Sequence, residues 1–222
     1  MLLIDLDPQA NLTLALGVPR PPVTIYEAMR GESGLQPVTA KENLDVVAST
    51  LDLSGAEMEL INEAGREFIL QELFDPFLEE YDFIIIDCPP SLNLLTVNAL
   101  VAANSVLIPL QSEFFALEGL SQLMLTIREI RQTANTNLRV EGVLLTMHDQ
   151  RNNLSQQVER DARDTLGALV YQTVIPRNVR LSEAPSFAVP ALTYDPTSKG
   201  ALAYQSFARE FLKNNNDLHE EA

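Results

Sequence analysis

The chain is poor in cysteine and in basic side chains. Its 222 residues contain one cysteine, Cys88, so no disulfide can form within the chain, and this usage is typical of a reducing compartment. Only 15 lysines and arginines stand against 31 aspartates and glutamates, which gives a formal net charge of −16. A chain this acidic is not an obvious DNA binder, because contacts to phosphate groups need a surplus of basic side chains on at least one face.

The chain also lacks an uninterrupted apolar run of the length that crosses a membrane. The stretch 88–112 carries no charged side chain, but prolines and asparagines interrupt it. A buried helix followed by a buried strand explains that stretch better. An acidic residue follows Met1–Ile4 at once, so we expect no signal peptide. These features predict a cytoplasmic protein with no membrane partner.

No G-x-x-x-x-G-K-[ST] motif occurs anywhere in the chain. In proteins that contain this motif, backbone N–H groups and a lysine surround the phosphate groups of a nucleotide. Without these groups, acidic side chains would face nucleotide phosphates with no positive charge beside them.

What the sequence does contain is organised around one apolar segment. Phe83–Ile86 predicts a fully buried strand of a parallel sheet, and this strand ends on Asp87. Pro89 and Pro90 follow, so neither a helix nor a strand can continue there. Ligands of open α/β sheets bind at the carboxyl ends of the strands, where an aspartate commonly holds magnesium beside phosphates. The segment alone does not decide whether Asp87 binds magnesium or is simply an aspartate that favours a turn.

Strands and helices alternate along the rest of the chain. Strands are expected from residue 2, over 44–48, 105–110, 138–147 and 170–175, and helices over 11–17, 25–29, 93–103, 117–130, 154–166 and 203–212. Ser54 and Glu57 have the spacing of a capping box, and helical periodicity follows to Phe77 with a break at Gly65. The pattern predicts an α/β fold with a mostly parallel sheet and helices on both faces. We expect a single domain over residues 1–213 and a polar tail over 214–222.

Three carboxylates follow predicted strands: Asp5 and Asp7 after the first, and Asp87 after the segment described above. If these strands are near neighbours, the three side chains converge on one edge of the sheet. Crowded carboxylates repel one another, so the arrangement is reasonable if they share a cation or an attacking water. This grouping favours the ligand-binding interpretation of Asp87.

Four segments carry a resemblance to a known family: Asp5–Gln9, Ile86–Ser91, Gln111–Gly119 and Ile175–Ser186. In order and spacing they resemble the motifs of the ParA/Soj family, the deviant-Walker ATPases of chromosome and plasmid partitioning, which are related to MinD. The resemblance runs from residue 2 to about Leu212. The last segment is the most specific, because Asp87–Pro90 alone fits related ATPases equally well.

The resemblance implies a role for individual positions. Asp87 matches the aspartate that holds magnesium, and Asp5 and Asp7 match a catalytic pair of which Asp7 orients the attacking water. The family's adenine loop corresponds to Pro176, Arg177 and Asn178. Its DNA-contacting arginines correspond to Arg151 and Arg180, although a solvent-exposed arginine outside any interface is an equal alternative for both.

The resemblance also implies cofactors and partners. The cofactors would be ATP and Mg²⁺, and two copies would form a homodimer around the nucleotides. The dimer would bind nucleoid DNA without sequence preference, and a ParB-type partner protein would stimulate hydrolysis. Localisation would be cytoplasmic, with association to the nucleoid.

Two departures from the family pattern bear on these roles. The family begins with a strand, a Gly-rich phosphate loop with two lysines and a helix, and none of these precedes Asp5 here. We therefore expect very weak ATP binding or none, an open strand edge beside the Asp87 strand, and a start assigned at an internal methionine. In the second departure, Phe187–Pro190 stands where the family has Gly-Lys before proline, so a cation near the expected DNA-binding face is missing.

Enzymatic activity is therefore open, and two alternatives remain. The chain could be a non-catalytic regulator that keeps the fold and the partner-binding surface. It could also be a cargo-positioning ATPase of the same superfamily. The acidic tail over 214–222 argues against a membrane-bound version, which needs a basic amphipathic helix.

Overall fold

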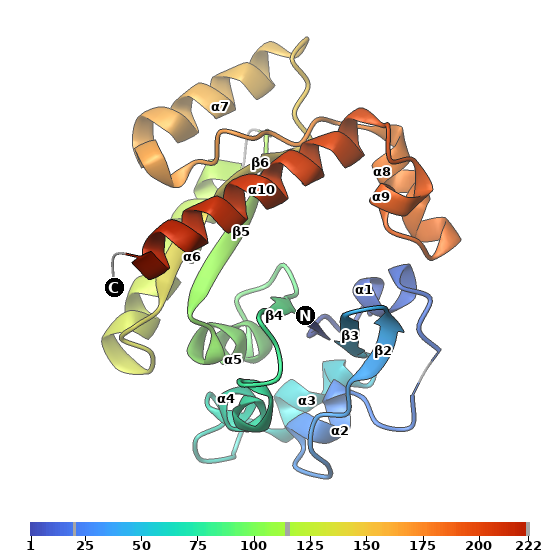
Figure 1. The fold of residues 1–222 in the computed structure, drawn as a ribbon. Coiled ribbons are helices and arrows are strands. Elements are labelled where there is room, and N and C mark those ends of the chain that lie inside the picture. Colours follow the sequence, from blue (N-terminus) through green and yellow to red (C-terminus); the bar gives the residue numbers. More distant parts are fainter. Residues whose placement is uncertain (20, 114–115, 221–222) are drawn as a thin grey trace. The chain divides into compact units, whose positions relative to one another are not determined.

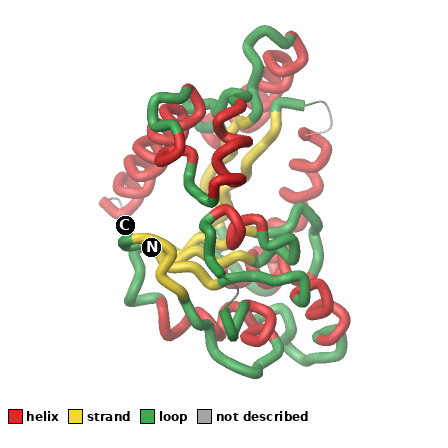
Figure 2. The backbone as a smooth tube through the Cα atoms, turned by 90° about the vertical axis from the view of Figure 1, so that its right-hand side faces the viewer, coloured by secondary structure: helices red, strands yellow, loops and turns green. Residues whose placement is uncertain are grey.

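The computed structural model of the chain describes residues 1–19, 21–113 and 116–220, and it divides into two compact units (Figure 1). Unit 1 contains Met1–Asn104 and Thr126–Leu138, and unit 2 contains Ser105–Leu125 and Arg139–Ala222. Each unit has its own parallel strands, drawn in yellow in Figure 2, together with helices. The predicted α/β fold with a mostly parallel sheet is therefore confirmed.

Short strands and helices alternate in unit 1. The elements are β1 (Leu2–Asp5), α1 (Asn11–Ala15), α2 (Ile25–Met29), β2 (Val38–Lys41), β3 (Leu44–Val47), α3 (Leu53–Glu59), α4 (Ile69–Phe74), the 3₁₀ turn η1 (Asp75–Phe77), β4 (Ile84–Asp87) and α5 (Leu94–Ala102). Most of these were expected from the sequence. The strand β2 was not, because Val38–Lys41 is short, partly exposed and contains no continuous apolar run.

The sheet of unit 1 has the order β2-β3-β1-β4, so the strand at the start of the chain lies inside the sheet. β1 pairs in parallel with both β3 and β4, and β2 forms an antiparallel hairpin with β3. The hairpin turns at Asn43, which has a φ of 58°, a left-handed conformation that asparagine tolerates. The central strand is buried, with Leu2 and Ile4 fully removed from solvent.

β4 lies at the edge of this sheet, and no strand within the described ranges pairs with its outer side. Ile85 is 48% exposed, while Ile84 and Ile86 are partly buried. The prediction of a fully buried strand is therefore wrong, whereas the expected open edge beside Asp87 is present. A continuous apolar run does not show how many neighbouring strands a strand has. The sequence therefore could not decide between a central strand and an edge strand.

One apolar core joins the sheet of unit 1 to its helices. Among its fully buried members, these six come from β1 and four helices: Leu2, Ile4, Ile25, Leu53, Leu70 and Leu95. The fully buried Asn98 links α5 to the start of α4. Its side chain accepts a hydrogen bond from the Leu70 backbone N–H (3.1 Å) and donates to the Arg66 carbonyl (2.8 Å). These bonds fix where α4 begins.

The helical periodicity predicted up to Phe77 corresponds to two separate helices. α3 ends at Glu59, turns follow, and α4 begins only at Ile69. The expected break is present, since Gly65 has a φ of 72° that a helix cannot contain.

The predicted capping box at Ser54 and Glu57 is wrong. α3 already begins at Leu53, and the Ser54 hydroxyl donates to the Leu51 carbonyl instead of capping the helix. A capping box does occur at α2, where Thr24 accepts from the Tyr26 N–H and Glu27 accepts from the Thr24 N–H. The same residue spacing thus forms a cap only where the preceding chain is extended.

Unit 2 is built on two parallel strands. Its elements are β5 (Ser105–Gln111), the first part of α6 (Ala116–Thr133), β6 (Arg139–Thr146), α7 (Asn153–Leu166), the 3₁₀ turn η2 (Gly167–Leu169), α8 (Val179–Glu183), the 3₁₀ turn η3 (Ala184–Phe187), α9 (Ala191–Tyr194) and α10 (Lys199–Glu220). β5 and β6 pair over their whole length, from Ser105 opposite Arg139 to Gln111 opposite Thr146.

The strand predicted over 170–175 is not formed as a regular strand. The segment instead forms isolated bridges, between Val143 and Val170 and between His148 and Pro176, and the Ile175 N–H donates to the Leu145 carbonyl on β6 (2.8 Å). Between these contacts, the carboxylate of Glu210 on α10 accepts from the backbone N–H groups of Gln172 (2.7 Å) and Thr173 (2.9 Å). A side chain from a distant helix thus satisfies backbone groups that a sheet ladder would otherwise pair.

The end of the chain is helical further than the sequence suggests. α10 continues to Glu220, beyond the boundary predicted between the domain and its polar tail. The last two residues of that tail, Glu221 and Ala222, lie outside the described residues. The single-domain boundary at 213 stays a prediction.

Candidate functional site

Two of the predicted acidic residues lie side by side at the carboxyl edge of the unit 1 sheet. β1 and β4 are parallel neighbours, and their register places Asp5 directly opposite Asp87. The Leu6 N–H donates to the Asp87 carbonyl (2.8 Å), which continues the pairing one residue beyond β1. Asp7 follows two residues after Asp5, and its charge acts on Asp87. The expected convergence of these carboxylates is therefore present.

Asp5 is fully buried and its carboxylate is surrounded by donors. Oδ2 accepts from the Thr13 backbone N–H (2.8 Å) and from the Thr13 hydroxyl (2.7 Å), and Oδ1 accepts from the Asp7 N–H (3.3 Å). Burial nevertheless raises the pKa of Asp5, since the hydrogen bonds from Thr13 and Asp7 offset only part of the desolvation. This carboxylate fixes the turn after β1.

Asp7 is only partly buried and keeps one carboxylate oxygen outside the turn. Its Oδ1 accepts from the Gln9 N–H (2.9 Å), and its backbone carbonyl accepts from the Ser49 hydroxyl (2.8 Å). The Ser49 N–H in turn donates to the Thr13 hydroxyl oxygen (3.0 Å). Thr13 and Ser49 therefore hold the acidic turn in place, although neither was identified from the sequence. Thr13 lies eight residues from Asp5, and no local pattern marks such a contact.

Asp87 is an exposed residue by surface area, yet protein atoms surround its carboxyl group closely enough to affect its ionisation. Desolvation, followed by the charges of Asp5 and Asp7, raises the pKa of Asp87 to about 6. A carboxylate that is hard to ionise alone is suited to a nearby cation, which would relieve the repulsion.

The residues present fit a magnesium site of the kind that phosphate-binding proteins use. Among the described residues, no three His, Cys, Asp or Glu side chains are arranged to hold a metal ion together. Mg²⁺ does not require such a cluster, because it usually takes one or two carboxylates and fills its remaining positions with water and phosphate oxygens. Asp87, with its raised pKa, is the carboxylate that suits this role.

We predict that Asp87→Asn stabilises the protein without ligand at neutral pH. The folded pKa of Asp87, about 6, lies above its unfolded value, so its favourable contribution is present at low pH and is lost as pH rises through about 6. Because the residue is exposed, solvent screening limits the gain to about 1 kcal/mol. Thermal unfolding should show a higher midpoint at about pH 8 and no gain at about pH 4.

Asp82→Asn is the matched control, since it removes an exposed carboxylate just before the same strand. An equal stabilisation by both substitutions, or a gain that does not depend on pH, would contradict the crowding of carboxylates at Asp87.

The residues predicted to contact adenine lie together in unit 2. Pro176 forms an isolated parallel bridge with His148, and the Arg177 N–H donates to the His148 carbonyl (2.9 Å). The Arg177 side chain lies 3.6 Å from Glu113 and lines a cavity of about 810 Å³ between β5, α6 and the start of α7. The Asn178 side chain accepts from the Arg180 N–H (2.9 Å) and caps α8, so its oxygen is already used.

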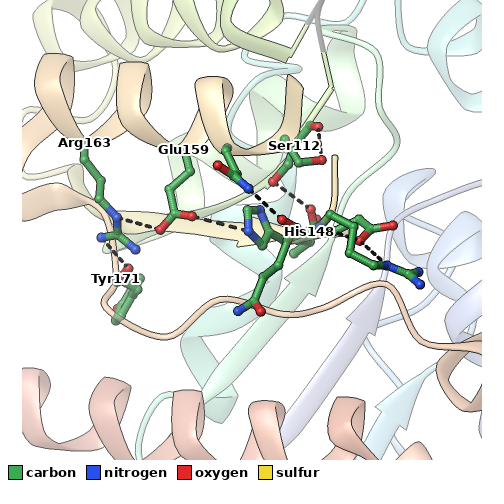
Figure 3. A network of polar contacts seen from close by, with 11 residues as sticks. Ser112, His148, Glu159, Arg163 and Tyr171 are labelled. Atoms are coloured by element: carbon green, nitrogen blue, oxygen red, sulfur yellow. Dashed lines mark hydrogen bonds and ion pairs between the residues drawn. The ribbon is translucent and has the colours of Figure 1, made fainter. Parts of the chain in front are cut away.

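A network of polar contacts holds this segment against α7 (Figure 3). His148 has only 6% of its side chain exposed, and its Nε2 lies 3.4 Å from Glu159. Glu159 also accepts from Arg163 (3.0 Å), and Arg163 donates to the Tyr171 carbonyl (3.2 Å). Only the fold shows which charged side chains of α7 form ion pairs and which face water. In the sequence they form one charged run: Glu159, Arg160, Asp161, Arg163 and Asp164.

The two arginines predicted to contact DNA both have acidic neighbours in unit 2. Arg151 has 92% of its side chain exposed, and its Nε lies 3.3 Å from Asp149. Arg180 is 51% exposed and contacts two carboxylates, Glu183 at 2.8 Å and Asp195 at 3.3 Å. Both guanidinium groups are accessible, but neither is a free positive charge.

Comparisons with known proteins agree with the α/β fold. The family model described as "AAA domain" matches residues 1–140. The chain is 50% identical over 217 residues to a chromosome partitioning protein ParA of Myxococcus xanthus, covering 96% of this chain and 77% of that protein. It is 48% identical over 219 residues to the sporulation initiation inhibitor protein Soj of Bacillus subtilis, covering 96% and 87% respectively.

A similar solved structure is a cobyrinic acid a,c-diamide synthase of Mycobacterium smegmatis, which contains bound ADP and magnesium. It is 36% identical to this chain, with a TM-score of 0.82 over 97% of this chain and 82% of that one. This likeness agrees with the expected α/β fold. On these matches, the chain belongs to the ParA/Soj family of chromosome-partitioning ATPases.

Proposed function

We propose that this chain acts in chromosome or plasmid partitioning as a MgATP-dependent ATPase that dimerises, binds DNA without sequence preference and responds to a ParB-type partner. The observation that carries the proposal is the pair of Asp5 and Asp87 on neighbouring strands, with the pKa of Asp87 raised to about 6. The Asp87 carboxylate is therefore suited to a nearby cation, in a chain whose relatives are named partitioning proteins.

Within this proposal the three acids have different tasks. Asp87 would hold Mg²⁺, which when bound neutralises charge on the phosphate groups. Asp7 would orient the attacking water through Oδ2, because Oδ1 is engaged by the Gln9 N–H. Asp5 acts as a positioning residue, since it is fully buried and its oxygens accept from Thr13 and Asp7.

The nucleotide base would lie against Pro176, Arg177 and Asn178. Two hydrogen bonds support this assignment, because His148 is bonded to the backbone on either side of Pro176: its N–H donates to the Ile175 carbonyl (3.1 Å) and its carbonyl accepts from Arg177. A loop fixed in this way needs little ordering when a ligand binds. Arg151 and Arg180 would contact DNA phosphates, for which the planar guanidinium group is well suited.

We also propose that the chain acts in the cytoplasm and at the nucleoid. No helix in the part of the chain that the structure describes is long and apolar enough to span a membrane. DNA binding would place the protein at the nucleoid when ATP is bound.

This chain should bind MgATP very weakly. It contains no G-x-x-x-x-G-K-[ST] motif, so the acids would face phosphate groups without the usual backbone N–H groups and lysine. We expect calorimetric titration to detect no saturable binding at micromolar MgATP. A version with the phosphate-loop segment of a relative fused ahead of Met1 should bind MgATP and hydrolyse it faster with DNA and a ParB-type partner. Micromolar affinity in the unextended chain would contradict the first expectation, and an inactive extended chain would contradict the proposed function.

The second candidate is a non-catalytic regulator, which the missing phosphate-loop motif favours. This candidate predicts that the purified chain unfolds cooperatively and stays monomeric without nucleotide. It also predicts that the chain binds a ParB-type partner without ATP. Aggregation of the purified chain would count against it.

A further inference from the structure

The basic residues of unit 2 that would contact DNA are not equally restrained by neighbouring acids. Arg180 lies between two carboxylates, with an Arg180 nitrogen 2.8 Å from Glu183 Oε2 and its Nε 3.3 Å from Asp195 Oδ2. These contacts hold the pKa of Arg180 above its usual value, with Glu183 as the main cause. Arg151 contacts Asp149 alone and is almost fully exposed.

The two carboxylates that hold Arg180 are themselves held in place. The Tyr194 hydroxyl donates to Glu183 Oε2 (3.2 Å), and the Thr197 hydroxyl donates to Asp195 Oδ1 (3.0 Å). The ring of Tyr194 also stacks on Phe187, with centroids 5.0 Å apart. Because these groups already have fixed positions, an ion pair with Arg180 costs less side-chain entropy than a pair of free surface residues would.

The helix that carries Arg180 has little freedom to turn away from these acids. A methyl group added at Gly200 on α10 would lie 2.5 Å from the Leu181 side chain, so α8 and α10 approach each other closely. Asn178 caps the start of α8 through the Arg180 N–H. The guanidinium group of Arg180 is therefore held beside Glu183 and Asp195 before DNA binds.

We propose that Asp195 and Glu183 form an electrostatic latch on Arg180 that a DNA phosphate must displace, so that these two acids determine the affinity and salt dependence of DNA binding. This inference rests on the proposed DNA-binding function. When a phosphate takes the guanidinium group, the released carboxylates attract cations from solution. Binding thus releases fewer ions overall than a free arginine would, and its affinity is lower.

The test is fluorescence anisotropy with a labelled DNA duplex of arbitrary sequence, about 20 bp or roughly two helical turns. Every variant is made in the version with the phosphate-loop segment fused ahead of Met1 and is measured with MgATP, because the proposed DNA binding requires the nucleotide-bound dimer. Asp195→Asn keeps the acceptor for Thr197 and removes the charge. We expect it to raise affinity roughly 3- to 10-fold at low salt. The slope of log affinity against log salt, measured between about 50 and 200 mM, should become more negative by up to about 0.9. Glu183→Gln should act in the same direction.

The matched control is Asp164→Asn, which removes one exposed charge from α7 of the same unit. The double variant Arg180→Ala with Asp195→Asn should lose the gain completely, since the gain acts through Arg180. Equal gains in Asp164→Asn and Asp195→Asn, or a gain that survives in the double variant, would overturn the latch.

Failure of the latch and failure of the proposed function give different results. If Arg180→Ala weakens binding but Asp195→Asn changes nothing, Arg180 contacts DNA and the latch is wrong. If no variant binds the duplex at low salt, both the latch and the DNA-binding function are wrong. Circular dichroism and thermal midpoints establish that each variant is folded.

Discussion

Replacing Thr13 by valine is expected to lower the free energy of unfolding by about 2–4 kcal/mol, although valine has nearly the same shape. The Thr13 hydroxyl donates to the fully buried Asp5 carboxylate (2.7 Å) and accepts from the Ser49 N–H (3.0 Å). Valine leaves a buried acceptor and a buried donor without this partner, and each loss costs about 1–3 kcal/mol. Urea unfolding should show a lower midpoint at an unchanged slope.

The cost of Thr13→Val should also depend on pH. The hydrogen bond from Thr13 lowers the pKa of Asp5 against the effect of burial, so its loss raises that pKa further. A folded pKa above the unfolded value gives stability at low pH that is lost as pH rises, so the deficit should be larger at about pH 8 than at about pH 4.

Thr13→Ser keeps the hydroxyl and should retain most of the stability. Thr39→Val, at an exposed position of β2, should change it by less than about 0.5 kcal/mol. A Thr13→Val protein that unfolds at the same urea concentration as the parent would show that the hydroxyl does not hold the acidic turn. Asp5 and Asp7 would then be held in position by other contacts.

Replacing Glu159 by alanine is expected to cost about 2 kcal/mol of stability, because it removes the central member of the network in Figure 3. His148 is almost fully buried and loses its carboxylate partner, and Arg163 loses the contact that aligns it with the Tyr171 carbonyl. A fully buried pair would cost more, but the Glu159 side chain is 27% exposed. Thermal unfolding measures the loss.

Hydrogen exchange should locate this effect. We expect faster exchange at the Tyr171 and Arg177 amides in Glu159→Ala, since the network holds the segment that contains them. The control is Asp161→Ala on the same helix, whose carboxylate accepts from Gln157 within α7. Asp161→Ala should leave exchange at Tyr171 and Arg177 unchanged. Equal effects of both substitutions would mean that Glu159 contributes only to the helix itself.

These two networks lie beside the residues to which the family resemblance gives functional roles. Thr13 holds the turn that carries Asp5 and Asp7, and Glu159 holds the segment that leads to Arg177. Neither Thr13 nor Glu159 was predicted as a site residue, since each acts through a partner far away in the sequence or on another element. Substitutions at these positions therefore test positioning and not chemistry.

The sequence by itself determined the α/β class, most element positions and the acids at the strand ends. Continuous apolar runs identified β1, β4 and β5, and Gly65 marked the break before α4. These features depend on neighbours within a few positions along the chain. Local sequence therefore contains the information that fixes them.

Only the tertiary structure decided which groups meet. It placed β4 at a sheet edge, replaced a predicted strand by contacts to Glu210, and put the Ser54 hydroxyl in a turn instead of a cap. It also paired Arg180 with Asp195 across fifteen positions of the sequence. The physical reason is that burial and ion pairing depend on distances in space, so residues of the same type make different contacts according to which groups the fold brings beside them.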